Sequence, residues 1–118
     1  SLPKKMRRQA IRCVLSSKAN EGWLILLDRF PDDQLKTRMM LETLSSLGIN
    51  SSVLIVTGNP ELQVVLAARN IPRTKTIPAR LLNVGDLVSH RYLLITVDAV
   101  RQAEQLWATE DTARQEVS

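Results

Sequence analysis

Three uninterrupted apolar runs, each as long as one β-strand, constrain the fold of this chain more than any other sequence feature. They occupy Trp23–Leu27, Val53–Thr57 and Tyr92–Thr96. A strand with one face in water alternates polar and apolar residues, whereas an unbroken run indicates a strand covered on both faces, as in a parallel sheet. We therefore expect all three runs to be strands buried on both faces.

Helical patterns separate these runs and complete the predicted fold. Helices are expected over 3–19, 35–47, 59–69, 84–89 and 97–107, with a short fourth strand at 76–78. Asn59 is the expected N-terminal cap of its helix and Gly48 the C-terminal cap of another. The expected core positions of the helix over 35–47 are Leu35, Met39, Leu44 and Leu47. Alternating helices and strands predict an α/β fold, a three-layer α/β/α sandwich with a mostly parallel four-stranded sheet.

The length of 118 residues allows one compact core. We expect a single domain over 1–107, followed by a polar tail at 108–118 that frays. Because the sequence begins at Ser1 without a Met, we expect a processed chain or a fragment of a longer one.

Several function classes lack the residues that they require. No apolar run reaches the roughly 18–20 residues of a membrane span, and no signal-peptide pattern opens the chain. One cysteine, Cys13, and one histidine, His90, cannot form a structural zinc site, and Cys13 is expected to be an inert core residue. The four glycines are too dispersed for a dinucleotide or phosphate loop. We expect no catalytic residues, metal, cofactor or membrane contact.

One alternative site remains open at the carboxyl ends of the predicted strands. Asp28, Thr57 and Thr96 follow three strands at the edge where parallel sheets usually bind ligands. They would suit a phosphoacceptor site in a small regulatory or ligand-binding domain. Helix capping and ordinary strand ends explain the same residues more simply.

The positive charge of the chain is concentrated at its start. Residues 1–20 contain six of the 16 Lys and Arg residues and none of the 12 acids. A helical projection places Lys5, Arg8 and Arg12 on one face. The opposite face, which is expected to meet the core, contains Met6, Ala10, Cys13, Val14 and Ser17, with Ile11 on its flank. Such a helix attracts a polyanion through its basic side. An acidic protein surface is an alternative partner.

A second group of bases follows later, at Arg69, Arg73, Lys75, Arg80 and Arg91. Arg69 and Asn70 end a predicted helix, where a forked donor and an amide suit a phosphate or a base edge. Aromatic residues make up only 3% of the chain, and Trp23 is expected to serve packing rather than base stacking. This composition favours a folded RNA surface recognised through its phosphates.

Three strings, in this order and spacing, resemble the family of bacterial large-subunit ribosomal protein four. They are Pro-Lys-Lys-Met-Arg-Arg at 3–8, Ala-Arg-Asn-Ile-Pro at 68–72 and Leu-Asn-Val-Gly-Asp-Leu at 82–87. The resemblance extends from Leu2 to about Leu106. In that family this region follows a long extended loop, so we expect a fragment that lacks that loop and the N-terminal segment.

The resemblance implies a cytoplasmic, ribosome-bound structural component that binds large-subunit rRNA and supports subunit assembly. It also implies neighbouring ribosomal proteins as partners, a monomer off the ribosome and, as in some relatives, repression of its own operon through the messenger leader. The residues to which RNA binding transfers are Lys4, Lys5, Arg7, Arg8, Arg12, Arg69 and Asn70.

Overall fold

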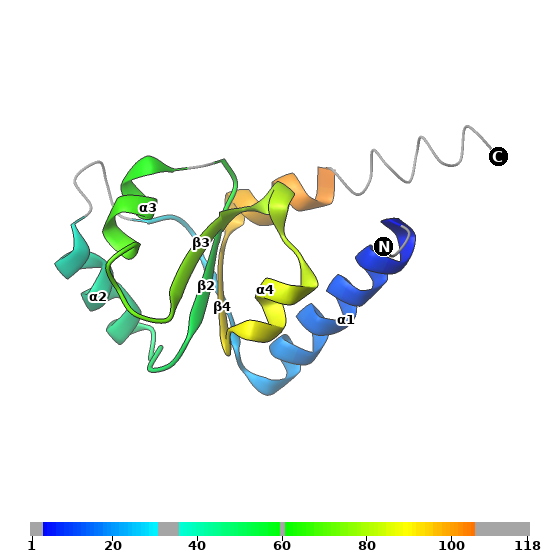
Figure 1. Ribbon diagram of the computed structural model, residues 1–118, viewed down its shortest axis with the longest axis horizontal. Helices are drawn as coiled ribbons and strands as arrows, with labels where there is room; N and C mark the ends of the chain where they lie inside the picture. Colours follow the sequence, from blue (N-terminus) through cyan, green and yellow to red (C-terminus); the bar gives the residue numbers. More distant parts are fainter. Residues whose placement is uncertain (1–3, 31–35, 60, 106–118) are drawn as a thin grey trace.

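The centre of the molecule is a four-stranded parallel sheet, seen in a computed structural model that describes residues 4–30, 36–59 and 61–105 (Figure 1). The strands are β1 (Leu24–Leu27), β2 (Val53–Thr57), β3 (Thr74–Pro78) and β4 (Tyr92–Thr96). Their order across the sheet is β1-β4-β2-β3, and all three pairings are parallel. The predicted parallel four-stranded sheet is confirmed.

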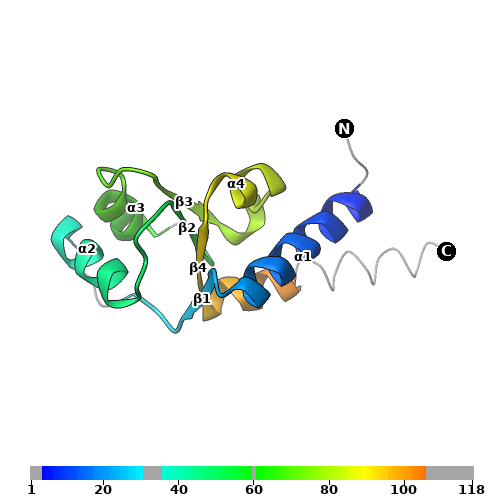
Figure 2. The same ribbon diagram turned by 90° about the horizontal axis from the view of Figure 1, so that it is seen from below.

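Helices cover both faces of this sheet. One layer contains α2 (Thr37–Ser46) and α3 (Leu62–Ala68). The other contains α1 (Lys4–Glu21), α4 (Val84–Ser89) and the helical residues 97–105, and a short 3-10 turn, η1 (Ala79–Leu81), follows β3. Figure 2 shows the two layers on opposite sides of the strands. The three-layer α/β/α sandwich is therefore confirmed.

The strand order explains why both faces are covered. The connections from β1 to β2 and from β2 to β3 proceed in one direction across the sheet, whereas β3 to β4 returns. Crossovers between parallel strands are almost always right-handed, so a reversal of direction moves the connecting helix to the other face. Accordingly α2 and α3 lie on one side and α4 on the other.

Strand β2 joins the two halves of the core. Val53 and Ile55 pack with α2 and α3, while Leu54 and Val56 pack with α1 and α4. All four side chains are at most 1% exposed. Burying a large aliphatic side chain contributes about 1.5–3 kcal/mol, so this unbroken apolar run anchors both layers, as its sequence predicted.

The same prediction is wrong for β1. It lies at an edge of the sheet, and Leu26 is 57% exposed although its neighbour Ile25 packs against the core. Leu26 points to the same side as Leu24, but the helical layer covers Leu24 and does not reach Leu26. An apolar run therefore identified the strand but not its position in the sheet.

Two details of the helices also differ from the prediction. Met40 is fully buried and Met39 is 38% exposed, so Met39 is wrong as a core position, whereas Leu44 is buried and Leu47 packs against the core as predicted. The N-terminal cap of α3 is Glu61 rather than Asn59, because the helix begins only at Leu62. Gly48 does end α2: its φ of 77° and the bond from Ile49 N–H to Leu44 O (3.0 Å) form a Schellman-type cap.

The ends of several predicted segments, including Leu35 and the tail at 108–118, lie outside the described residues. No helix in the described parts of the chain is long and apolar enough to cross a bilayer.

Candidate nucleic-acid interface

The face through which the first helix docks is only partly the one predicted. Arg8 and Ile11 are its buried residues, at 8% and 7% exposure. Met6 is 53% exposed and Cys13 is exposed, so these two core positions, and with them the inert core cysteine, are wrong, whereas Val14 packs against the core as predicted. The reason lies in Ile11 and Leu15, two large aliphatic residues four positions apart, which pack against the sheet and α4.

This orientation changes the role of the basic residues on α1. Arg8 lies three residues before Ile11 on the docking stripe and is only 8% exposed, so its predicted placement on the outward basic face is wrong. Lys18 lies on the same stripe about two turns beyond Ile11. Long basic side chains can line an interior because their methylene stems are apolar.

The other predicted residues of α1 remain on the surface. Lys4, Lys5 and Arg7 are exposed in the first turn, and Arg12 is exposed further along. We call Lys4, Lys5 and Arg7 the first-turn cluster. Within the described residues, no carboxylate forms an ion pair with any of the three, and the first turn of α1 contains no acid.

The helix end itself adds to the positive potential of the first-turn cluster. The N-terminus of a helix carries about half a positive charge, so bases there cost stability of about 0.3–1 kcal/mol each and acids are preferred. The cluster is therefore not placed there to stabilise the helix.

Arg69 and Asn70 lie far from the first-turn cluster. Arg69 ends α3, where its N–H donates to Val65 O (3.0 Å), and both side chains are exposed. They occupy the edge of the sheet from which the strands start, on the layer opposite α1. The 18 residues of α1 span about 27 Å, and its first turn is the end remote from that edge (Figure 1). The structure therefore does not join the two predicted basic regions into one patch.

The strand order creates a basic surface that the sequence did not reveal. Trp23, Arg91, Ser52 and Arg73 each precede one strand, in the order β1-β4-β2-β3 across the sheet. Arg91, Ser52 and Arg73 are level with one another, and Trp23 is level with Tyr92, one residue further along β4. Backbone bonds fix this row: Leu93 N–H donates to Trp23 O (2.9 Å) and Val53 N–H donates to Arg73 O (3.0 Å). We call these four residues the arginine edge. The sequence signal was the second group of bases, but only the topology brings Arg73 and Arg91 together.

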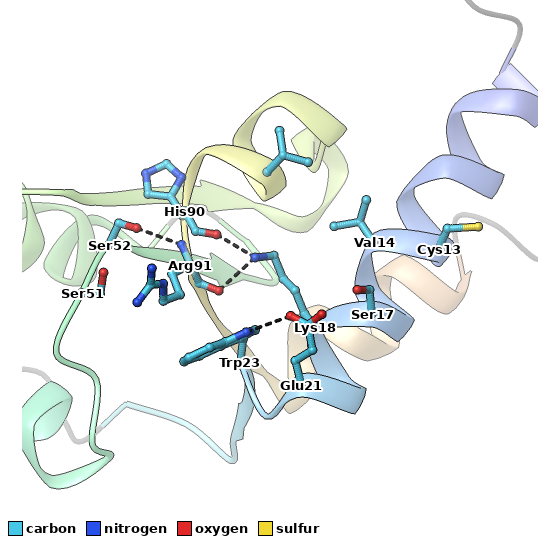
Figure 3. Close-up of a pocket in the computed structure, with 11 residues that line it drawn as sticks. Cys13, Val14, Ser17, Lys18, Glu21, Trp23, Ser51, Ser52, His90 and Arg91 are labelled. Atoms are coloured by element: carbon cyan, nitrogen blue, oxygen red, sulfur yellow. Dashed lines mark hydrogen bonds between the residues drawn. The ribbon is translucent and has the colours of Figure 1, made fainter.

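A groove of about 630 Å³ opens where the arginine edge meets α1 (Figure 3). Lys18 extends across it and donates to two carbonyl oxygens, those of His90 (2.7 Å) and Arg91 (2.9 Å). Burial lowers the pKa of Lys18, and the nearby Glu21 carboxylate counteracts this effect. Lys18 therefore ties α1 to the segment before β4, and its charge serves the fold.

At the opposite edge, where the strands end, the two threonines of the alternative phosphoacceptor site form hydrogen bonds with the backbone. The Thr57 hydroxyl donates to Asn59 O (3.0 Å), and Thr96 Oγ1 accepts from Ala99 N–H (3.2 Å), capping the helical residues 97–105. Asp28 is exposed beyond the edge strand β1. Burial and, secondarily, the Asp98 carboxylate raise the pKa of Glu61 at this edge. No group of three or more potential metal ligands was found within the described parts of the chain.

Comparisons with known proteins agree with the resemblance. The ribosomal protein L4/L1 family matches residues 1–106. Relatives named large ribosomal subunit protein uL4 include that of Dehalococcoides mccartyi, 50% identical over 90% of this chain and 50% of its own length. Those of Syntrophomonas wolfei and Acetivibrio thermocellus are 41% and 39% identical, over 91% and 92% of this chain and 52% of theirs.

The chain thus spans about half the length of the curated relatives it matches. The match nevertheless includes the whole described domain, from α1 through β4 and the helical residues that follow. The chain belongs to the ribosomal protein L4/L1 family.

Proposed function

We propose that this domain is a structural, non-enzymatic component of the large ribosomal subunit that binds rRNA through the first-turn cluster of α1. The observation that carries the proposal is the placement of Lys4, Lys5 and Arg7, three exposed bases on a positive helix end whose first turn contains no acid. The name of its relatives, large ribosomal subunit protein, supports the same role.

The proposed mechanism is electrostatic. Exposed Lys and Arg side chains neutralise phosphates and release counterions, while the shape of the folded RNA provides selectivity. Arg12, exposed on the same helix, extends the contact along α1, and Arg69 with Asn70 forms a separate contact at the other side of the sheet. Arg8 is not included in this contact surface, because it is only 8% exposed.

Further roles belong to the same proposal. They are support of subunit assembly, contacts with neighbouring ribosomal proteins, a monomeric state off the ribosome in the cytoplasm, and repression of its own operon through the messenger leader. Competition between an rRNA fragment and that leader for the purified domain tests whether one surface serves both RNAs.

The decisive experiment is a salt titration of binding to large-subunit rRNA fragments. Each phosphate contact contributes about −0.7 to −0.9 to the slope of log affinity against log salt. The triple variant Lys4→Gln, Lys5→Gln, Arg7→Gln should therefore flatten the slope by about 2–3 and weaken binding at low salt.

The control is Arg29→Gln, Arg38→Gln, Arg101→Gln, which removes three exposed bases elsewhere and changes the net charge equally. Its slope should change little. An unchanged slope in the first-turn variant, or an equal loss in the control, would refute the proposed contact.

A further inference from the structure

The guanidinium of Arg91 forms the outer layer of a stack at the arginine edge. Its Cζ lies 5.4 Å from the centroid of the Trp23 ring. Trp23 in turn packs edge-to-face against Tyr92, with ring centroids 5.1 Å apart and an interplanar angle of 90°. Trp23 therefore serves packing, as predicted. Arg91 itself is exposed, so a planar cation lies over a fixed aromatic ring and faces solvent.

The backbone of Arg91 is held from two sides. Its N–H donates to Ser52 Oγ (2.8 Å) at the start of β2, and its carbonyl accepts from Lys18 Nζ (2.9 Å) on α1 (Figure 3). Three elements thus fix the Cα from which the side chain extends. Such preorganisation lowers the entropy lost when a ligand binds.

The second arginine of this edge, Arg73, also indicates that the edge binds a ligand. Its φ is 58°, in the left-handed region that favours glycine or asparagine. A β-turn at this position gains nothing structural from a long cationic side chain, so the backbone strain indicates a use for the guanidinium. One strand separates Arg73 from Arg91, about 10 Å between their backbones.

A groove lies beside Trp23 and Arg91. Its volume of about 630 Å³ is within the range of about 300–1,000 Å³ typical of ligand clefts. Hydroxyl groups of Ser17, Ser51 and Ser52 line it. Glu21 is the one carboxylate among the described residues of its lining, and it accepts a hydrogen bond from the Trp23 indole N–H (2.9 Å).

We propose that the arginine edge binds an unpaired RNA nucleotide, with its base stacked on the guanidinium of Arg91 and an adjacent phosphate on Arg73. This inference rests on the proposed function, because it assumes that the domain binds RNA. It adds the kind of RNA that binds at a second surface. Bases in loops and bulges stack on aromatic rings and on Arg planes, whereas a duplex offers this edge only phosphates. The stacked guanidinium therefore favours an unpaired base.

The test uses a short single-stranded RNA and the matching duplex as probes, with Trp23 as the reporter. Trp107→Phe leaves Trp23 as the only tryptophan. The single strand should quench its fluorescence and bind more tightly than the duplex. Because base stacking contributes about 1–3 kcal/mol, R91Q and R91K should each weaken single-strand binding about 5-fold or more. R91K keeps the charge and thereby separates stacking from simple attraction.

R73G provides an independent test, because glycine adopts the left-handed conformation at this position without strain. Its melting temperature should stay the same or rise, while single-strand affinity falls. Retained wild-type affinity in R91K, absence of Trp23 quenching, or quenching by an acidic peptide in place of RNA would overturn the inference.

The two proposals fail in distinguishable ways. Normal binding of folded rRNA without quenching at Trp23 removes only the nucleotide site. Loss of folded rRNA binding in the first-turn variant, with unchanged quenching at Trp23, confirms that the two surfaces act separately. If the domain binds neither probe nor the rRNA fragments, both proposals are refuted.

Discussion

The first-turn cluster and the arginine edge are both cationic, but they differ in how the fold holds their charges. Lys4, Lys5 and Arg7 are consecutive or nearly so on one helix end, and their side chains are exposed. Arg73 and Arg91 come from the starts of two strands, and Arg91 is held over Trp23. Exposed charges on a helix end attract a polyanion over a long range and in a salt-sensitive way. A guanidinium held in one orientation instead favours ligands whose shape fits that orientation. The comparison suggests that one surface supplies affinity and the other selectivity.

A second lesson comes from bases that belong to neither surface. Arg8 and Lys18 lie in the acid-free start of the chain, yet one is buried and the other holds two backbone carbonyls. Local charge density therefore overstated the number of residues available to RNA. Three variants sharpen this distinction, from the largest expected effect to the smallest.

Ile11→Ala should have the largest effect, because it removes the anchor that docks α1. Truncating a buried Ile costs about 2–5 kcal/mol, and Ile11 is only 7% exposed. Met6→Ala, on the face that the sequence predicted as core, should cost less than about 0.5 kcal/mol. Urea unfolding of both variants measures the difference, and equal losses would contradict the docking face described above.

Lys18→Met should lower the free energy of unfolding by about 1–3 kcal/mol, because two carbonyls lose a charged donor. It should also weaken single-strand binding at the arginine edge, since Arg91 loses one of its two backbone supports. The slope of folded rRNA binding against salt should change little. A flatter slope with unchanged stability would instead show that Lys18 contacts RNA directly.

Asp86→Asn should have the smallest effect. Lys75 Nζ bonds Asp86 Oδ1 at 2.8 Å, and this bond, followed by one from Asn83, lowers the pKa of Asp86 below 3.8. A carboxyl whose pKa is lower in the folded than in the unfolded state stabilises the fold at pH values above its unfolded pKa. That contribution is lost as the pH falls through the folded pKa. Wild-type stability should therefore decline more steeply at acid pH than that of the variant, by less than about 1 kcal/mol.

The same pair tests where the arginine edge ends. Lys75 already has an anionic partner, so Lys75→Gln should reduce single-strand binding less than Arg73→Gln does. Parallel affinity measurements on the two variants decide this, and equal losses would extend the RNA surface into β3.

Much of the fold was predictable because its signals are local. The apolar runs identified β2 and β4 and Gly48 marked the end of α2, since strand burial and a left-handed cap each depend on a few adjacent residues. The first-turn cluster was predictable for the same reason. Leu26, Met39 and Arg8 were misjudged because their burial depends on which distant element covers them.

The sequence by itself therefore determined the kinds of elements, the parallel sheet and a basic helix end. Tertiary structure alone decided which face of α1 docks and which bases line one edge. The physical reason is that a weakly amphipathic helix is oriented by its largest apolar contacts, here Ile11 and Leu15. Likewise, the residues before four strands become neighbours only when the crossovers set the order β1-β4-β2-β3.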